Sequence, residues 1–196
     1  MPRLNPAVYL ALAFLPASPA AADAECESAA RAAMLDVRHK VAMTQHTETV
    51  MGEFVLKSTA ITTPDNRGLV LDENDVPVSL WIGRKFYTSA DGGKTWSLLS
   101  ETSEAAEAAY FDALRRQAEN ATAITCAPGI AFEGRTVDHY TLDYALASTG
   151  AAMRGEYWVD TVTRFPWRIV TTSSVNTIIQ NNEPNPDAVI PDPDGG

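Results

Sequence analysis

Basic residues are scarce in this sequence. Its 196 residues include 15 Lys and Arg against 25 Asp and Glu, and the formal net charge at pH 7 is −10. Proteins that bind nucleic acid neutralise its phosphates with clustered Lys and Arg, and anionic membrane surfaces attract proteins in the same way. The composition therefore argues against nucleic acid and anionic membranes as partners.

Residues suited to catalysis are also few. The histidines are His39, His46 and His139, and none has a His or Cys three or four residues away, as zinc ligands commonly do. His139 follows Asp138, which can orient a general base, but no nucleophile motif of the G-x-S-x-G kind accompanies it. Gly-rich phosphate-binding motifs are absent. We expect no enzyme, no metal and no cofactor, with His139 a polar residue on a solvated sheet face.

Long apolar runs are missing except near the start. Residues 7–15 form an apolar run behind Arg3 that is much shorter than the ~20 residues needed to span a bilayer. The run is followed by prolines and small residues, which is typical of a signal peptide cleaved after Ala22 or Ala24. A buried core helix is the alternative. We expect residues 1–22 to be a signal peptide for export to the periplasm, and the remaining chain not to span a membrane.

Cysteine occurs only twice, at Cys26 and Cys126. An even number of cysteines in an oxidising compartment favours a disulfide. Closing a loop of about 100 residues would remove roughly 4.7 kcal/mol of unfolded-state freedom in the chain-entropy model. Two buried free thiols are the alternative, and a metal site is less favoured because the spacing is not that of metal ligands. We predict a disulfide between the two.

The periodicity of apolar residues predicts two helices and a set of antiparallel strands. Residues 25–38 and 103–120 have the composition and 3.6-residue repeat of amphipathic helices. Alternating patterns predict strands at residues 41–49, 51–62, 79–88, 94–99, 130–133, 136–146, 153–160 and 167–180, the last with a break near Ser174. Each helix precedes a block of strands. This order favours an α+β fold with two helices covering one face of an antiparallel sheet.

The chain forms one domain with a tail in this interpretation. Residues 64–68 and 72–75 have the composition of turns. Residues 23–181 contain no internal repeat and are expected to be a single domain. Residues 182–196 are rich in Pro and Asp, which predicts a flexible solvated tail with, at most, a short edge contact through residues 188–190.

One local motif has a high specificity. Residues 89–96, Ser-Ala-Asp-Gly-Gly-Lys-Thr-Trp, resemble the Asp-box hairpin of sialidases and other β-propellers. In such a turn Asp91 can accept hydrogen bonds from backbone N–H groups, and Trp96 packs on the outgoing strand. The motif occurs once, in a chain too short for a propeller. We therefore interpret it as a stable hairpin without a catalytic role.

Large apolar side chains gather on one face of the second strand block. Tyr140, Leu142 and Tyr144 alternate along one strand, and Tyr157 lies on the next. The helix over residues 103–120 has an apolar stripe that could face them. The candidate ligand-binding residues are Tyr110, Phe111, Leu114, Tyr140, Leu142, Tyr144 and Tyr157. A core filled by the helices and an apolar cavity left between helix and sheet remain open alternatives.

Three sequence segments resemble segments of periplasmic proteins in the lipoprotein-carrier (LolA-like) superfamily. Residues 81–87, Trp-Ile-Gly-Arg-Lys-Phe-Tyr, with Gly93 and Trp96 are similar to a family hairpin. Residues 134–140, Gly-Arg-Thr-Val-Asp-His-Tyr, resemble the start of the next long strand in the superfamily. Residues 158–168, from Trp158 to Arg168, resemble a second hairpin of the superfamily. Arg164 stands where the family pattern has Gly, so the turn differs or Arg164 is strained.

The resemblance covers about residues 80–170 and implies an incomplete, curved antiparallel β-barrel whose helices cover an apolar cavity. Members of the superfamily carry acylated lipoproteins, hold lipids or sense envelope stress. We therefore expect an exported, periplasmic, non-enzymatic protein that binds a lipophilic ligand, either a lipid or an acylated lipoprotein. The alternatives are an envelope interaction or sensing module with an apolar patch near Trp158 or Trp167, and a hydrolase using His139.

Overall fold

The computed structural model describes residues 24–36 and 40–193. The expected signal peptide, residues 1–22, and His39 lie outside the described residues. Within them, no helix combines the length and apolar character needed to cross a bilayer.

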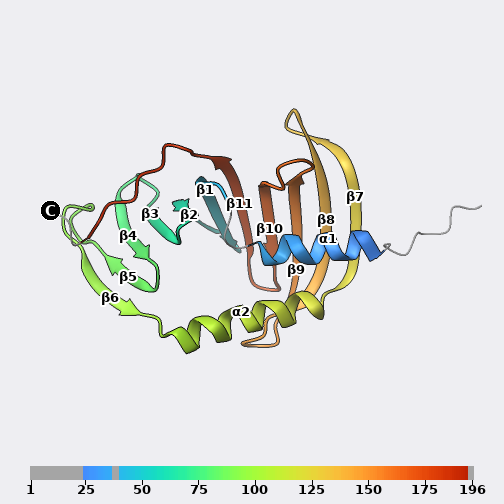
Figure 1. Cartoon of the computed structure of the whole chain (residues 1–196), viewed down its shortest axis with the longest axis horizontal. Coiled ribbons are helices and arrows are strands. Elements are labelled where there is room, and N and C mark those ends of the chain that lie inside the picture. Colours follow the sequence, from blue (N-terminus) through green and yellow to red (C-terminus); the bar gives the residue numbers. More distant parts are fainter. Residues whose placement is uncertain (1–23, 37–39, 194–196) are drawn as a thin grey trace, which may run out of the picture.

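In the described residues, eleven antiparallel strands form one curved sheet (Figure 1). Its order is β6-β5-β4-β3-β2-β1-β11-β10-β9-β8-β7. The strands are β1 (Met43–Met51), β2 (Phe54–Thr63), β3 (Arg67–Leu71), β4 (Pro77–Ile82), β5 (Lys85–Thr88), β6 (Ser97–Glu101), β7 (Thr122–Phe132), β8 (Arg135–Ala145), β9 (Ala152–Asp160), β10 (Pro166–Thr172) and β11 (Thr177–Pro184). The two helices, α1 (Ala24–Leu35) and α2 (Glu104–Glu119), lie on one side of it. The predicted α+β fold, an incomplete antiparallel barrel with two helices, is confirmed.

The helix α2 connects the two edges of the sheet. It follows β6 and precedes β7, which are the first and last strands in the sheet order. Ser103 caps it, because the Ser103 side chain accepts a hydrogen bond from the N–H of Ala106, and acidic residues occupy its first turn. In Figure 1 the helix runs across the open side of the sheet. The barrel is therefore closed by a helix where strands do not meet.

Several strands differ from the sequence predictions. The strand expected at 79–88 is two strands joined by a tight turn at Gly83, whose φ of 59° suits glycine. Residues 67–71 form β3, a strand that was not predicted, and its first two residues belong to the turn expected at residues 64–68. β7 begins at Thr122, well before the strand expected at 130–133. Turns and strand ends share residue types, so local composition did not locate these boundaries.

Two clusters of buried side chains form the core. On the inner face, which faces the helices, Ala30 and Met34 of α1 pack with Tyr140, Leu142 and Tyr157. On the outer face, the cluster comprises Leu69, Leu80, Tyr87 and Ile190.

The segment after β11 covers the outer cluster. In Figure 1 this dark red segment passes outside β3 and β4. β11 extends to Pro184, and Ile190 is only 7% exposed. The flexible tail expected from residue 182 is therefore wrong at these positions, because Asn182 is a buried strand residue and Ile190 is part of a core.

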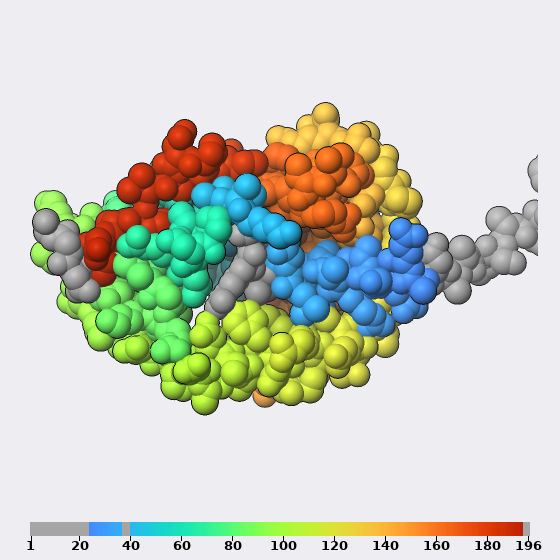
Figure 2. Space-filling model, viewed as in Figure 1, coloured from blue at the N-terminus to red at the C-terminus, as the bar shows by residue number. Residues whose placement is uncertain are grey.

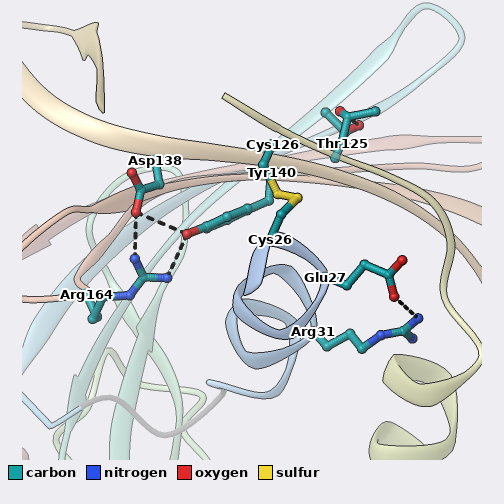
Figure 3. Close-up of a disulfide and its surroundings, with 9 residues drawn as sticks. Cys26, Glu27, Arg31, Thr125, Cys126, Asp138, Tyr140 and Arg164 are labelled. Atoms are coloured by element: carbon teal, nitrogen blue, oxygen red, sulfur yellow. Dashed lines mark hydrogen bonds and ion pairs between the residues drawn. A yellow bond between two sulfur atoms is a disulfide. The ribbon is translucent and has the colours of Figure 1, made fainter. Parts of the chain in front are cut away.

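A disulfide joins the start of α1 to β7. Cys26 and Cys126 are bonded, with their Cα atoms 6.0 Å apart, which confirms the pairing predicted from the cysteine count (Figure 3). Disulfides are typical of proteins that fold outside the cytoplasm, so this bond indicates an extracytoplasmic protein. From α1, Arg31 donates hydrogen bonds to carbonyl oxygens at the end of α2, including those of Glu119 (2.7 Å) and Ala121 (3.2 Å). The disulfide thus positions α1, and α1 in turn fixes one end of α2.

The turn between β9 and β10 is held by Arg164. Its φ is 61°, so Arg164 takes the left-handed conformation of the glycine that the family pattern has there. Its guanidinium donates to Asp138 Oδ2 at 2.8 Å and to the Tyr140 hydroxyl at 3.0 Å (Figure 3). The Tyr140 hydroxyl donates to Asp138 at 3.1 Å. These bonds offset the backbone strain, which typically costs about 1–3 kcal/mol.

Candidate functional site

The side of α2 that faces the sheet borders a cavity. This α2 cavity has a volume of about 500 Å³, and its lining includes Trp81, Phe86, Ala106, Tyr110 and Phe111. Only Ala118, near the end of the helix, is buried among the residues of α2. Tyr110 remains 54% exposed. A sixteen-residue helix whose apolar side chains are so little buried does not fill the space beneath it.

A second cavity continues along the inner face of the sheet. This floor cavity has a volume of about 370 Å³ and shares Asn66 and Trp81 with the α2 cavity. Its lining includes Met34 of α1 and residues of the central strands, among them Met43, Gln45, Tyr157, Ile169 and Gln180. In the space-filling view an opening lies between the teal strands and the start of α2 (Figure 2). The two cavities together follow the inner face from β5 to β9.

Small and polar side chains on the central strands leave this space open. Gln45 pairs across the ladder with Ala60, and Met43 pairs with Thr62. Gln180 of β11 lies opposite Thr47. A core requires large apolar residues at such inward positions. The weak apolar bias of β1, already evident in its Thr-rich sequence, is the local cause of the cavity.

Two glycines allow aromatic rings to lie flat on the floor. A Cβ on Gly68 would lie 2.1 Å from carbons of the Trp81 ring, and a Cβ on Gly155 would lie 2.8 Å from the Tyr157 ring. Both glycines are in strands and neither has a positive φ, so space rather than backbone conformation requires them. Each ring covers the sheet without rising into the cavity above it.

The sequence-predicted site residues are distributed over several places. Tyr110 and Phe111 line the α2 cavity, whereas Leu114 is half-buried on the same helix. Tyr157 lines the floor cavity. Tyr144 lines a third cavity of about 520 Å³ near the end of α2. Tyr140 and Leu142 are buried in the inner core under α1.

The structure therefore places the cavities nearer the first strand block than the sequence suggested. Sequence reasoning missed Trp81, Phe86, Gln45 and Gln180. The alternation of Met43 and Gln45 with outward residues was visible in the sequence. Which of the two helices covers which half of the sheet depends on long-range packing.

Burial alters the titration of the inner tyrosines. Burial raises the pKa of Tyr157 well above its ordinary value, and the nearby Tyr144 adds to this effect. Burial likewise raises the pKa of Tyr144, and a hydrogen bond with Thr171 partly opposes it. Both hydroxyls are therefore protonated at neutral pH and able to donate hydrogen bonds.

His139 lies on the outer face, away from the cavities. Its ring stacks on Trp158 with centroids 4.3 Å apart, and its Nε2 is 3.4 Å from Glu156 Oε2. The side chain is 21% exposed, so it is part of an aromatic stack rather than freely solvated. In the described parts of the chain, no group of three His, Cys, Asp or Glu residues is arranged to hold a metal ion.

The Asp-box hairpin is stabilised as expected. Asp91 Oδ1 accepts hydrogen bonds from the N–H groups of Lys94 (3.1 Å) and Thr95 (2.9 Å), and Ser89 Oγ accepts one from Gly93 (2.8 Å). Hydrogen bonds, first of all from the Thr95 side chain, lower the pKa of Asp91 to about 2. Trp96 packs against the outer core.

Comparisons with known proteins show the fold. No protein-family model matches the sequence, and no curated protein matches it significantly. The crystal structure of lipoprotein LppX from Mycobacterium tuberculosis is similar, with a TM-score of 0.58 at 11% identity over 87% of this chain and 100% of LppX. LprF from Mycobacterium bovis gives a TM-score of 0.50 at 13% identity, covering 87% and 96%.

A LolA-superfamily protein, NE2245 from Nitrosomonas europaea, gives a TM-score of 0.37 at 7% identity over 85% and 94% of the two chains. At these identities the likeness concerns fold alone. The chain has the LolA-like fold, shared with LppX, that the sequence resemblance implied.

Proposed function

We propose that this protein is a periplasmic carrier that binds the apolar chain of a lipid or an acylated lipoprotein between α2 and the inner face of the sheet. The observation that carries the proposal is the cavity beneath α2. Tyr110 and Phe111 line it from the helix, and Trp81 and Phe86 line it from the sheet. Apolar pockets with a few polar groups and volumes of about 300–1,000 Å³ are typical ligand sites.

The energetics favour an apolar chain in this position. Each CH₂ group removed from water contributes about 0.8 kcal/mol, so a chain of about ten CH₂ groups gains about 8 kcal/mol before the cost of association. A bound chain would also cover the exposed aromatic side chains of α2. The bound ligand would thus fill space beneath α2 that the protein's own side chains leave unfilled.

Four further observations agree with this function. The disulfide fits an oxidising compartment, and residues 1–22 have the pattern of a signal peptide. The fold is that of LppX, which is itself described as a lipoprotein. The incomplete barrel with a bridging helix leaves an entrance that a closed barrel would lack.

Titration with N-phenyl-1-naphthylamine, an uncharged apolar fluorophore, tests the proposal. The delipidated protein should bind it saturably, and Phe111→Ala should weaken binding roughly tenfold, equivalent to about 1.4 kcal/mol. Phe54→Ala is the matched control, because Phe54 is 75% exposed in β2 and is absent from the lining of either cavity. Absence of saturable binding by the folded wild type, or equal effects of the two variants, would contradict the proposal.

An envelope interaction module is the second candidate, and a feature of the outer face favours it. Arg135 lies over the Trp167 ring at 3.9 Å, and Phe132 stacks on Trp158 at 5.7 Å. Trp and Arg are enriched among residues that dominate protein interfaces. Photo-crosslinkers placed at residue 158 or 167 would capture a defined periplasmic partner, while one at Phe54 would not. Crosslinking that is equal at all three positions would remove this candidate.

A further inference from the structure

Three polar side chains on the wall of the floor cavity have no hydrogen-bond partner within the described residues. They are Gln45 of β1, Gln180 of β11 and Tyr157 of β9. Tyr157 is only 6% exposed, and its ring lies over Gly155. Buried polar groups are nearly always hydrogen-bonded, and leaving one unpaired costs free energy. The Tyr157 residue is buried, but its hydroxyl has no partner among the described residues and is accessible from the cavity, so it is available to form a hydrogen bond with a ligand there.

The sheet register brings the three groups together. Gln45 is paired with Asn182 and Thr47 with Gln180, so Gln45 and Gln180 are diagonal neighbours on adjacent strands. Ile169 links the other two, since it pairs with Gln180 on one side and with Tyr157 on the other. Diagonal neighbours are within reach of long side chains. The two amides and the phenol thus occupy one region of the cavity wall.

All three groups are uncharged. Burial keeps the Tyr157 hydroxyl protonated, because it raises the pKa of this group. The charged residues along the floor cavity are Asp36, which is exposed, and Arg67. Arg67, at the start of β3, lines the same cavity as Asn66 and Trp81, and its Nε is buried without a hydrogen-bond partner. Arg67 pairs with Thr63 of β2, whereas Gln45 pairs with Ala60, so the cation of the described lining is two strands and three residues away from Gln45. An anion bound beside Gln45, Gln180 and Tyr157 would therefore not be paired with it.

We propose that the site selects amphiphiles in which an apolar chain is joined to an uncharged hydrogen-bonding group, such as an ester or an amide, and that Gln45, Gln180 and Tyr157 bind that group. This inference rests on the proposed function. The chain extends past Trp81 into the α2 cavity, because both cavities share that residue. A carboxylate in the same place is disfavoured, since burying an anion without a counter-charge is costly.

Displacement of N-phenyl-1-naphthylamine by three palmitoyl compounds tests the selection. The compounds are 1-monopalmitoylglycerol, N-palmitoylethanolamine and palmitate, so the chain is constant and only the ester, amide or carboxylate differs. At pH 7.5, below their aggregation thresholds, the ester or the amide should displace the fluorophore at roughly tenfold lower concentration than palmitate. The neutral compound that displaces the fluorophore at the lower concentration indicates whether the natural ligand resembles a glycerolipid or an N-acylated chain.

Two variants test whether the residues of the cavity wall cause the preference for the neutral compounds. Tyr157→Phe removes only a hydroxyl that has no protein partner, so the free energy of unfolding should be unchanged or higher, while affinity for the preferred neutral compound falls roughly three- to tenfold. The double variant Gln45→Leu with Gln180→Leu should reduce the preference over palmitate to less than about threefold.

Palmitate binding as tightly as both neutral compounds would overturn the inference, as would variants that bind all three like the wild type. If the fluorophore binds but none of the compounds displaces it, the inference fails and the proposed function stands. If the fluorophore itself does not bind, both fail.

Discussion

Replacing Gly68 with Ala tests whether the space above Trp81 is open. The new Cβ would lie 2.1 Å from two carbons of the Trp81 ring, whereas carbon atoms in contact are about 3.5–4.0 Å apart. The ring must therefore move by about 1.5–2 Å, away from the strand and into the region where the two cavities meet. This movement should narrow the passage between the cavities and weaken binding of N-phenyl-1-naphthylamine roughly tenfold.

The effect on stability should be small. An Ala in a strand interior is favoured over Gly by about 0.5–1 kcal/mol, and overpacking in a filled core typically costs about 1–3 kcal/mol. Because the ring moves into open space, we expect the lower part of that cost and a net loss of about 1 kcal/mol or less in the free energy of unfolding. Urea unfolding of wild type and Gly68→Ala measures it.

A second substitution isolates the mechanism. Trp81→Leu removes the ring that Gly68 accommodates, so Gly68→Ala should have little further effect on binding in that background. Equal effects of Gly68→Ala with and without Trp81 would refute the argument. A loss of more than about 3 kcal/mol in Gly68→Ala would refute it too, because it would mean that the ring has no space to move into.

Other predictions concern elements outside the cavities. Removing the disulfide by Cys26→Ala with Cys126→Ala should lower the free energy of unfolding by about 3–5 kcal/mol, given the separation of 100 residues, and urea titration without reductant compares the two proteins. Ile190→Ala should cost about 2–4 kcal/mol in the same assay, whereas Val189→Ala, at a position 80% exposed, should change stability by less than about 0.5 kcal/mol. Hydrogen bonds lower the pKa of Asp91 to about 2 in the folded protein, from an ordinary value of 3.8. The contribution of the ionised Asp91 to the free energy of unfolding is therefore present above pH 4 and lost as the pH falls towards 2. Asp91→Asn should flatten this part of the curve of unfolding free energy against pH.

The sequence was most informative where the physical cause is local. The Asp91 turn was predictable because its hydrogen bonds join residues within one hairpin. Ser103 directly precedes an Ala- and Glu-rich run, which is the pattern of a helix start. The Cys26–Cys126 bond followed from there being no other cysteine to pair with.

The site was harder to place because its cause is not local. Both helices have apolar stripes, and the sequence favoured α2 as the cover of Tyr140 and Leu142. In the structure, Ala30 and Met34 of α1, which the disulfide ties to β7, pack on that face instead. α2 then spans the remaining width of the sheet above an open floor. Similarly, Gly68 indicated a turn by composition, whereas its role is to accommodate a ring from the next strand.

The pairing of β1 with β11 has a consequence for how the protein folds. Met43 lies opposite Pro184, so the central ladder of the sheet joins residues near the two ends of the domain. Proteins dominated by such distant pairings fold slowly, because a long loop must close before the contacts form. Until β11 arrives, β1 presents an unpaired edge, and such edges readily pair with other chains. In the proposed export, with the amino terminus crossing the membrane first, this edge of β1 would stay unpaired for most of the translocation. The protein's yield should therefore depend on the rate of translocation and on chaperones that shield the edge until the last strand is delivered.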